Sequence, residues 1–211
     1  MKIKMFTVGR LFTNCYVLSC KQTKEAIILD PGFDDANEAE KIFQYTKTEK
    51  LQLKYIVNTH GHPDHTCGNG IVKKEFNIPI LIHEYDAYML KSRRLFSFFS
   101  FKTYSPPADL LLHNGDFIKF GKVMLKVMHT PGHTRGSISL IGEKEVFSGD
   151  VLFAGSIGRT DFPESSNHDM FNSLKKLANL PDYFIVYPGH GPLTRIGEEK
   201  RNNPFLQSFS E

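Results

Sequence analysis

Thr59-His60-Gly61-His62-Pro63-Asp64-His65 is the stretch that decides the fold. It follows the apolar run 53–57, which predicts a buried β-strand that ends where the histidines begin. Neutral imidazoles and a carboxylate suit zinc, iron or manganese, and a strand would hold their spacing while Gly61 and Pro63 shape the turn. The stretch therefore predicts a metal-binding loop at the carboxyl end of a strand.

The composition is that of a globular protein. A chain of 211 residues with a formal net charge of +3 can bury a sizeable core, and we expect one domain over 1–211. Its lysines and arginines are scattered, which argues against a nucleic-acid partner. No apolar run reaches the ~20 residues of a membrane span, and the N-terminus lacks the apolar core of a signal peptide. We therefore expect a cytoplasmic protein that binds neither nucleic acid nor membrane.

Hydrophobic patterning alternates between strands and helices in the first half of the chain. The predicted strands cover 3–8, 15–18, 26–29, 53–58 and 78–82, and the predicted helices cover 34–50, 70–76 and 84–90. This β-α-β-α alternation implies partly parallel pairing. It also places the histidine loop at the carboxyl ends of the strands, where open α/β sheets hold their ligands.

The second half returns to strands separated by glycines. The predicted strands cover 110–112, 117–120, 123–128, 137–141, 145–147 and 184–187, and the predicted helices cover 167–180 and 197–205. Two such halves predict an α/β fold in which two mixed β-sheets pack face to face with helices on the outer faces, an αββα sandwich.

A dense aromatic segment begins at Leu95 and ends at Tyr104. It is too short and too closely flanked by charge to span a membrane. Three interpretations remain open for it: packing on the core, a lid over the active site, or the contact of a homodimer.

Further possible ligands follow strands downstream, each next to a glycine. His133 lies in Thr130-Pro131-Gly132-His133-Thr134, Asp150 ends Phe147-Ser148-Gly149-Asp150, and His190 lies in Tyr187-Pro188-Gly189-His190-Gly191. With the first loop they make seven groups. Seven are too many for one tetrahedral ion and suit two ions bridged by a carboxylate.

We expect two sets of ligands that share Asp150 as a bridge. The sets are His60, His62 and His133 on one ion, and Asp64, His65 and His190 on the other. A water bound to both ions would be a hydroxide near neutral pH, because two divalent charges lower its pKa toward ~7. This metal-bound hydroxide provides a nucleophile without a serine or cysteine, and Asp64 could instead help to move a proton.

These motifs, in this order, resemble the metallo-β-lactamase superfamily over nearly the whole chain. Within it, Gly158-Arg159-Thr160-Asp161-Phe162-Pro163 resembles the glyoxalase II-like (hydroxyacylglutathione hydrolase-like) branch. The resemblance implies the αββα fold, the seven ligands named above, two divalent ions that are zinc, iron or manganese, and hydrolysis of a small thioester such as S-lactoylglutathione. Only 192–211 follows His190, so we expect no separate C-terminal glutathione-binding helical domain.

A second relative differs in its reaction. Persulfide dioxygenases also resemble this chain, and they hold one iron by two histidines and an aspartate, which here would be His60, His133 and Asp150. Such a triad leaves open positions for oxygen and a sulfur substrate. We favour the hydrolase.

Three more residues are expected to support the site. Arg159 and Asp161 are opposite charges in a glycine-bounded turn, and we expect an ion pair that braces the loop rather than a contact to substrate. The family resemblance implies that Asp30 supports the metal loop from behind the ligands.

Overall fold

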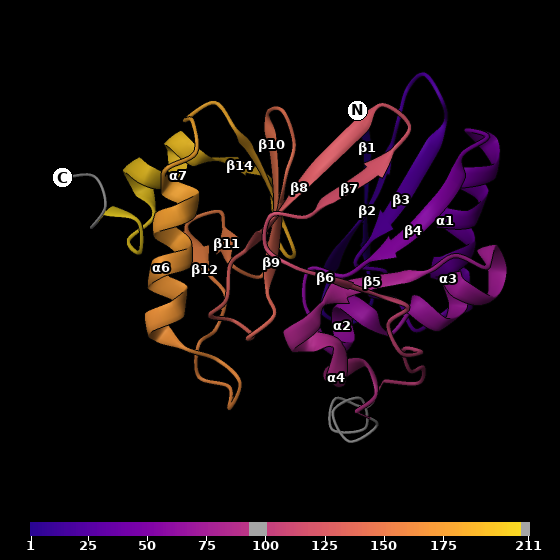
Figure 1. The fold of residues 1–211 in the computed structure, drawn as a ribbon, viewed down its shortest axis with the longest axis horizontal. Coiled ribbons are helices and arrows are strands. Elements are labelled where there is room, and N and C mark those ends of the chain that lie inside the picture. The colour runs from indigo at the N-terminus through magenta and orange to yellow at the C-terminus, as the bar shows by residue number, and fades with distance from the viewer. Residues whose placement is uncertain (93–100, 208–211) are drawn as a thin grey trace.

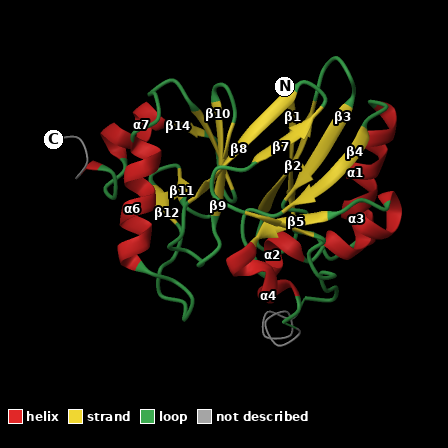
Figure 2. Ribbon diagram, viewed as in Figure 1, coloured by secondary structure: helices red, strands yellow, loops and turns green. Residues whose placement is uncertain are grey.

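In the computed structural model, which describes residues 1–92 and 101–207, two six-stranded β-sheets pack face to face (Figure 1). Helices cover the outer face of each sheet, as Figure 2 shows by colour. The predicted αββα sandwich is therefore confirmed. Among the described residues, no helix is both long and apolar enough to cross a membrane.

The first sheet has the strand order β1-β2-β3-β4-β5-β6. Its strands are β1 (Lys2–Val8), β2 (Thr13–Ser19), β3 (Glu25–Leu29), β4 (Gln52–Val57), β5 (Ile80–His83) and β6 (Leu110–Leu112). The first three strands are antiparallel, and β3, β4, β5 and β6 run parallel. The carboxyl ends of the parallel strands therefore meet at one edge, which is where the histidine loop begins.

The second sheet has the order β14-β13-β10-β9-β8-β7. Its strands are β7 (Phe117–Phe120), β8 (Val123–His129), β9 (Ile138–Ile141), β10 (Glu145–Gly149), β13 (Ile185–Pro188) and β14 (Thr194–Arg195). Only the pairing of β10 with β13 is parallel among these described strands. A separate hairpin, β11 (Leu152–Phe153) and β12 (Ser156–Ile157), follows Asp150.

Helices pack where the strands offer apolar side chains to both faces. They are α1 (Ala36–Thr48), α2 (Pro63–Thr66), α3 (Asn69–Phe76), the 3₁₀ turn η1 (Glu84–Asp86), α4 (Ala87–Leu90), α6 (Asn167–Ala178) and α7 (Ile196–Asn202). In β3, Ile28 faces outward and joins a cluster with Ile42 of α1, whereas Ile27 and Leu29 face the second sheet. Because β3 is buried on both faces, it is continuously apolar in sequence.

Several predicted boundaries shift for local reasons. The helix predicted from residue 34 begins at Ala36, because the Asp35 side chain accepts a hydrogen bond from Asn37 N (2.7 Å) and caps it. The helix predicted over 84–90 is the 3₁₀ turn η1 followed by the single turn α4. The short helix α2 inside the histidine loop was not predicted.

Strand β2 ties the two sheets together at the end that carries the histidines. The Asn14 side chain donates to the carbonyls of Pro188 (3.1 Å) and Gly191 (2.9 Å). The backbone N–H of Asn14 donates to the carbonyl of Gly189 (2.7 Å). The Tyr16 hydroxyl also donates to the Pro188 carbonyl, at 2.7 Å. The loop after β13 is thereby fixed against the first sheet.

The aromatic segment 95–104 lies partly outside the described residues, so its roles as a lid or homodimer contact stay predictions. Its described end packs on the chain: Phe101 is buried against Cys67, and the Thr103 hydroxyl donates to the Cys67 carbonyl (2.8 Å). Burial raises the pKa of the Cys67 thiol, as expected for a packing residue.

Candidate metal centre

All seven predicted ligand side chains converge on loops that leave the carboxyl ends of strands in both sheets. Four lie between β4 and α3, and the other three follow β8, β10 and β13: His60, His62, Asp64, His65, His133, Asp150 and His190. Their donor atoms form three sets that each lie within 4.8 Å. We call His60, His62 and His133 the first half of the centre, and Asp64, His65 and His190 the second half; Asp150 joins His60 and His65 in the third set.

In the first half, hydrogen bonds fix which imidazole nitrogen is free. His133 Nδ1 donates to the Arg159 carbonyl (2.9 Å), because a carbonyl can only accept. His133 Nε2 is then free to bind, and it lies 2.9 Å from His62 Nδ1. The Thr59 hydroxyl donates to Asp30, so it accepts from His60 Nδ1 (3.1 Å) and leaves His60 Nε2 free as well.

The second half follows the same logic. His65 Nδ1 donates to Asp30 Oδ2 (3.0 Å), and His190 Nδ1 donates to the Leu11 carbonyl (3.0 Å). Their Nε2 atoms lie 3.2 Å apart, and His190 Nε2 is 3.2 Å from Asp64 Oδ2. Imidazoles oriented in this way by an outer acceptor are typical of metal sites.

Asp150 lies against both halves. Its Oδ2 is 3.5 Å from His133 Nε2 and 3.5 Å from His190 Nε2, and its Oδ1 is 3.4 Å from His65 Nε2. Gly189 makes this approach possible, since a Cβ there would lie 2.1 Å from Asp150 Oδ1. One carboxylate thus contacts ligands of both halves, as a bridging residue must.

Two buried atoms test whether a metal fits. Among the described residues, His60 Nε2 and Asp150 Oδ1 have no hydrogen-bond partner although both are buried. Buried polar atoms are nearly always satisfied, so an orphaned nitrogen and oxygen facing the same cluster match the donors of a divalent ion. The chain therefore carries a metal-binding His/Asp cluster.

Residues 8–190 match the family described as the metallo-β-lactamase superfamily. The chain belongs to this superfamily. Two relatives cover its full breadth: an uncharacterized protein of Aquifex aeolicus is 39% identical over 210 residues (97% of each chain), and the hydroxyacylglutathione hydrolase GloC of Haemophilus influenzae is 37% identical over 218 residues (100% of each). The mouse mitochondrial persulfide dioxygenase ETHE1 is 29% identical over 201 residues, covering 92% of this chain and 71% of that one.

Solved structures of superfamily members superpose closely on this chain. The B3 metallo-β-lactamase BLEG-1 has a TM-score of 0.89 at 39% identity and covers 97% of this chain and 99% of its own. ETHE1 from Myxococcus xanthus has a TM-score of 0.81 at 29% identity, covering 97% and 84%. TTHA1623, solved in a di-iron-bound form, has a TM-score of 0.80 at 32% identity, covering 96% and 100%. These neighbours share the fold and differ in the activity or metal for which they are named.

Burial and neighbouring charges shift the pKa values of the clustered side chains in opposite directions. Burial lowers the pKa of His60 well below its usual value, which keeps the imidazole neutral. Burial would also lower the pKa of His190, but hydrogen bonds to Asp150 and Asp64 raise it to about 9. Although burial opposes it, His65 holds the pKa of Asp150 well below its usual range. The carboxylates thus draw positive charge into the second half, where a metal ion would replace protons.

Asp30 contacts one of the candidate ligands and the loop that carries four of them. It is buried, and it accepts from Thr59 N (2.7 Å), the Thr59 hydroxyl (2.6 Å) and His65 Nδ1 (3.0 Å). It therefore holds the start of the histidine loop and orients a ligand of the second half.

Arg159 and Asp161 form the predicted ion pair. The guanidinium donates twice to the carboxylate, from Nε to Oδ1 (2.9 Å) and from Nη2 to Oδ2 (2.7 Å), and stands over the Phe162 ring at 4.6 Å. Both charged side chains are about two-thirds exposed, at 67% and 65%. The side-chain pair stabilises the exposed turn 159–161. The backbone carbonyl of Arg159 accepts the hydrogen bond from His133 Nδ1.

A cavity of about 460 Å³ opens onto the cluster. Its apolar lining includes Leu11, Phe153, Ile157 and Phe162, and its polar lining includes His62, Asp64, His133, Asp150 and His190. An apolar cleft with a few convergent polar groups is typical of a small-molecule site.

Three groups near the cluster were not predicted from the sequence. Asp86 is buried between two of the ligand loops, Glu164 Oε1 lies 3.7 Å from His62 Nε2, and the Leu11 carbonyl orients His190. Asp86 lies three residues after the end of β5, the strand that pairs with β4, and this position was a usable signal. A backbone carbonyl has no signal in the sequence.

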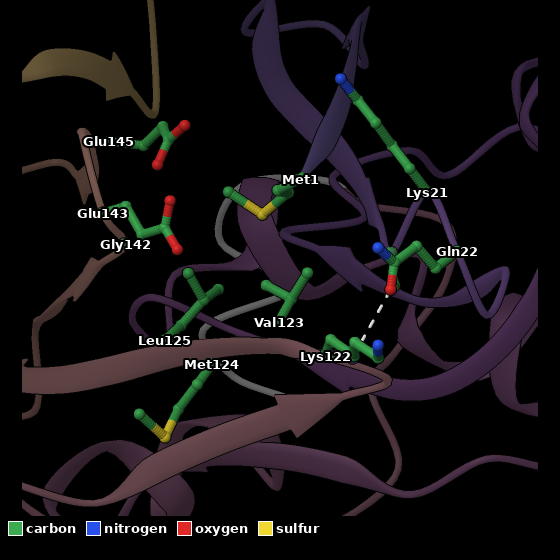
Figure 3. Close-up of a pocket in the computed structure, with 11 residues that line it drawn as sticks. Met1, Lys21, Gln22, Lys122, Val123, Met124, Leu125, Gly142, Glu143 and Glu145 are labelled. Atoms are coloured by element: carbon green, nitrogen blue, oxygen red, sulfur yellow. Dashed lines mark hydrogen bonds between the residues drawn. The ribbon is translucent and has the colours of Figure 1, made fainter.

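A second hollow, of about 410 Å³, lies at the opposite ends of the strands (Figure 3). Lys21, Lys122, Glu143 and Glu145 line it together with apolar side chains. None of the potential metal-ligand clusters found among residues 1–92 and 101–207 includes a residue of this hollow. Ligand chemistry is therefore concentrated at the histidine end of the described structure.

Proposed function

We propose that this protein is a dinuclear metallohydrolase that cleaves a small thioester to a carboxylic acid and a thiol. One ion would be held by the first half of the centre and the other by the second half, with Asp150 between them. The observation that carries the proposal is the position of Asp150, whose carboxylate lies 3.4 to 3.5 Å from His65, His133 and His190. Zinc suits these donors, and iron or manganese would also fit.

Bound divalent ions supply a water of lowered pKa and a Lewis acid for a carbonyl oxygen. The protein contributes the geometry. His60, His65, His133 and His190 are held in one tautomer by their outer hydrogen bonds, so their binding nitrogens are preorganised. Asp64, which accepts from the Thr13 hydroxyl (3.4 Å), lines the cavity and is placed either to bind an ion or to hold a proton.

The cavity supports a small substrate with an apolar portion. Leu11 and Phe153 would contact one part of the thioester, and Ile157 and Phe162 another, while the carbonyl lies over the candidate ligands. As the water oxygen bonds to the carbonyl carbon and the C–S bond breaks, the sulfur leaves as a thiolate with the electron pair of that bond and becomes the thiol on gaining a proton. The full-length match to the hydroxyacylglutathione hydrolase GloC, at 37% identity, supports a thioester as the substrate class.

Persulfide dioxygenase activity is the second candidate. It is favoured by the likeness to mouse ETHE1 and to ETHE1 from Myxococcus xanthus, each 29% identical. One iron would then be bound by His60, His133 and Asp150, with open positions for oxygen and a persulfide. The complete second half, with Asp64, His65 and His190 in contact, favours two ions and hence the hydrolase.

The deciding experiment combines metal analysis with parallel assays. The purified protein is analysed for zinc, iron and manganese, then assayed on S-lactoylglutathione, on glutathione persulfide with oxygen monitoring, and on a chromogenic β-lactam. We expect two ions per chain and thioester cleavage without oxygen uptake. One iron per chain with persulfide-dependent oxygen uptake and no thioester cleavage would establish the dioxygenase instead, and β-lactam cleavage alone would overturn both.

A further inference from the structure

Asp86 joins two ligand loops that come from different sheets. It ends η1, directly after β5, and its side chain is fully buried. Oδ2 accepts from Gly61 N (2.9 Å), in the histidine loop of the first sheet. The same oxygen accepts from the Thr134 hydroxyl (2.6 Å), and Oδ1 accepts from Gly136 N (2.7 Å), both in the loop between β8 and β9 of the second sheet.

Two of the three donors are sequence neighbours of candidate ligands of the first half, and Gly136 lies three residues after His133. Gly61 lies between His60 and His62, and Thr134 follows His133. The carboxylate therefore sets how closely the two loops approach, across the gap in which His62 Nδ1 and His133 Nε2 are 2.9 Å apart. A second contact holds the same gap, since Ile138 N donates to the Thr59 carbonyl (2.9 Å).

The surroundings leave Asp86 little freedom to move. A Cβ at Gly136 would lie 2.6 Å from the carboxylate carbon of Asp86, so glycine is needed for the loop to come this close. The Thr134 hydroxyl donates a hydrogen bond to Asp86 and accepts one from the Ser137 hydroxyl (2.7 Å). These two bonds orient the Thr134 hydroxyl. Helix α4, which continues from η1, also lies against the histidine loop, since a Cβ at Gly61 would lie 2.6 Å from the Met89 Cβ.

We propose that Asp86 is a positioning residue that fixes the spacing of the first half of the centre and thereby the affinity of its ion. The inference rests on the proposed metal centre. Asp86 acts through Gly61, Thr134 and Gly136. Its removal should therefore lower the affinity of the first half for its ion and leave the affinity of the second half unchanged. Outer residues that orient ligands typically contribute a factor of ~10 to 100 in metal affinity.

The test is a zinc titration of Asp86→Asn against a competing chromophoric chelator. The amide keeps one oxygen acceptor but turns its NH₂ toward a donor that the carboxylate satisfied. We expect one of the two affinities to fall ~10- to 100-fold and the other to change less than about threefold. Titrations of His62→Ala and His190→Ala assign each affinity to its half.

Asp109→Asn is the matched control. Asp109 is a carboxylate at the other end of β5, where it accepts from Ile80 N (2.8 Å) and pairs with Lys73. It makes the same kind of strand-end contact without touching a ligand loop, so both zinc affinities should be unchanged. Cobalt substitution gives a second readout: the visible bands of the first-half ion should shift in Asp86→Asn and not in Asp109→Asn.

A milder pair of variants decides the case if Asp86→Asn does not fold. Thr134→Val removes one donor to Asp86 and should lower the first-half zinc affinity several-fold. Thr134→Ser keeps the hydroxyl and should have the wild-type affinity. Two unchanged affinities in Asp86→Asn, or equal weakening of both halves, would overturn the proposal. A wild-type protein that binds no metal would instead overturn the proposed function, and two bound ions without thioesterase activity would leave Asp86 open to the same test.

Discussion

The two halves of the centre are held in different ways. The first half consists of three imidazoles on loops from both sheets, and the buried carboxylate of Asp86 joins those loops without touching a ligand. The second half includes the carboxylate Asp64, and Asp30 contacts its His65 directly. The second half thus places more negative charge where an ion would bind, whereas the first relies on the spacing of three imidazoles. We expect the second half to bind its ion more tightly.

Removing Asp150 should have the largest effect, because its carboxylate lies against both halves. Asp150→Ala takes away the carboxylate shared by both and leaves two cations close together with less charge between them. We expect the metal content to fall from two ions to one or fewer, and thioesterase activity to fall about a thousandfold or more, because the ions contribute several kcal/mol to the transition state.

Elemental analysis and steady-state kinetics check this outcome. Asp161→Ala, at the exposed rim, serves as the control that loses a carboxylate and keeps its metals. Full metal occupancy in Asp150→Ala would mean that Asp150 is not a bridge.

Metal removal should expose the unequal affinities as a thermal effect. A ligand at a thousand times its Kd stabilises the folded state by ~4 kcal/mol, which for a domain of this size corresponds to a drop in Tm of roughly 8–16 °C on chelation. Calorimetry with stepwise return of zinc should show recovery in two stages, the first from the tighter half. A single stage at two equivalents would show that the halves are equal.

Asp30→Asn mirrors the Asp86 variant on the other half. Asp30 accepts from His65 Nδ1 and from two donors of Thr59, so the amide loses at least one of these bonds. We expect the second-half affinity to fall ~10- to 100-fold and the first-half affinity by a smaller factor, transmitted through Thr59 and His60. Chelator competition measures both, and a larger loss in the first half would reverse the comparison.

The smallest effect is expected from Glu164→Gln. Glu164 Oε1 is 3.7 Å from His62 Nε2, which is longer than a hydrogen bond, so the contact should contribute no more than ~1 kcal/mol. The first-half affinity should therefore fall about fivefold at most, as measured by the same zinc titration. Glu143→Gln, at the hollow of Figure 3, is the distant control. A hundredfold fall in the first-half zinc affinity would show that Glu164 contributes as much as is proposed for Asp86.

The architecture and the seven ligand candidates could be predicted because their signals are local. The histidine loop follows the apolar run 53–57, and His133, Asp150 and His190 each lie next to a glycine after a predicted strand. The order of the sheets places the strand ends together, so residues such as His133 and His190 could be assigned to one centre from sequence alone.

The residues behind the ligands were harder to predict, for physical reasons. Asp86 acts through two backbone amides and a hydroxyl from separate loops, and such contacts depend on the docking of the sheets. His190 is oriented by the backbone carbonyl of Leu11. Every residue type has such a carbonyl, so the residue's identity gives no signal in the sequence. Helix α2 is a single turn over Pro63–Thr66, too short for hydrophobic periodicity to reveal.

The bonds from Asn14 to Pro188 and Gly191 join positions 174 and 177 residues apart. On the ribosome, the loop with His60 and His65 is therefore made long before the strand that completes the centre. His190 follows His65 by 125 residues, which takes roughly 6–25 s at ordinary elongation rates. During that interval the nascent chain carries only part of the candidate ligand set. The complete set of seven exists only after β13 and the loop that follows it have been made.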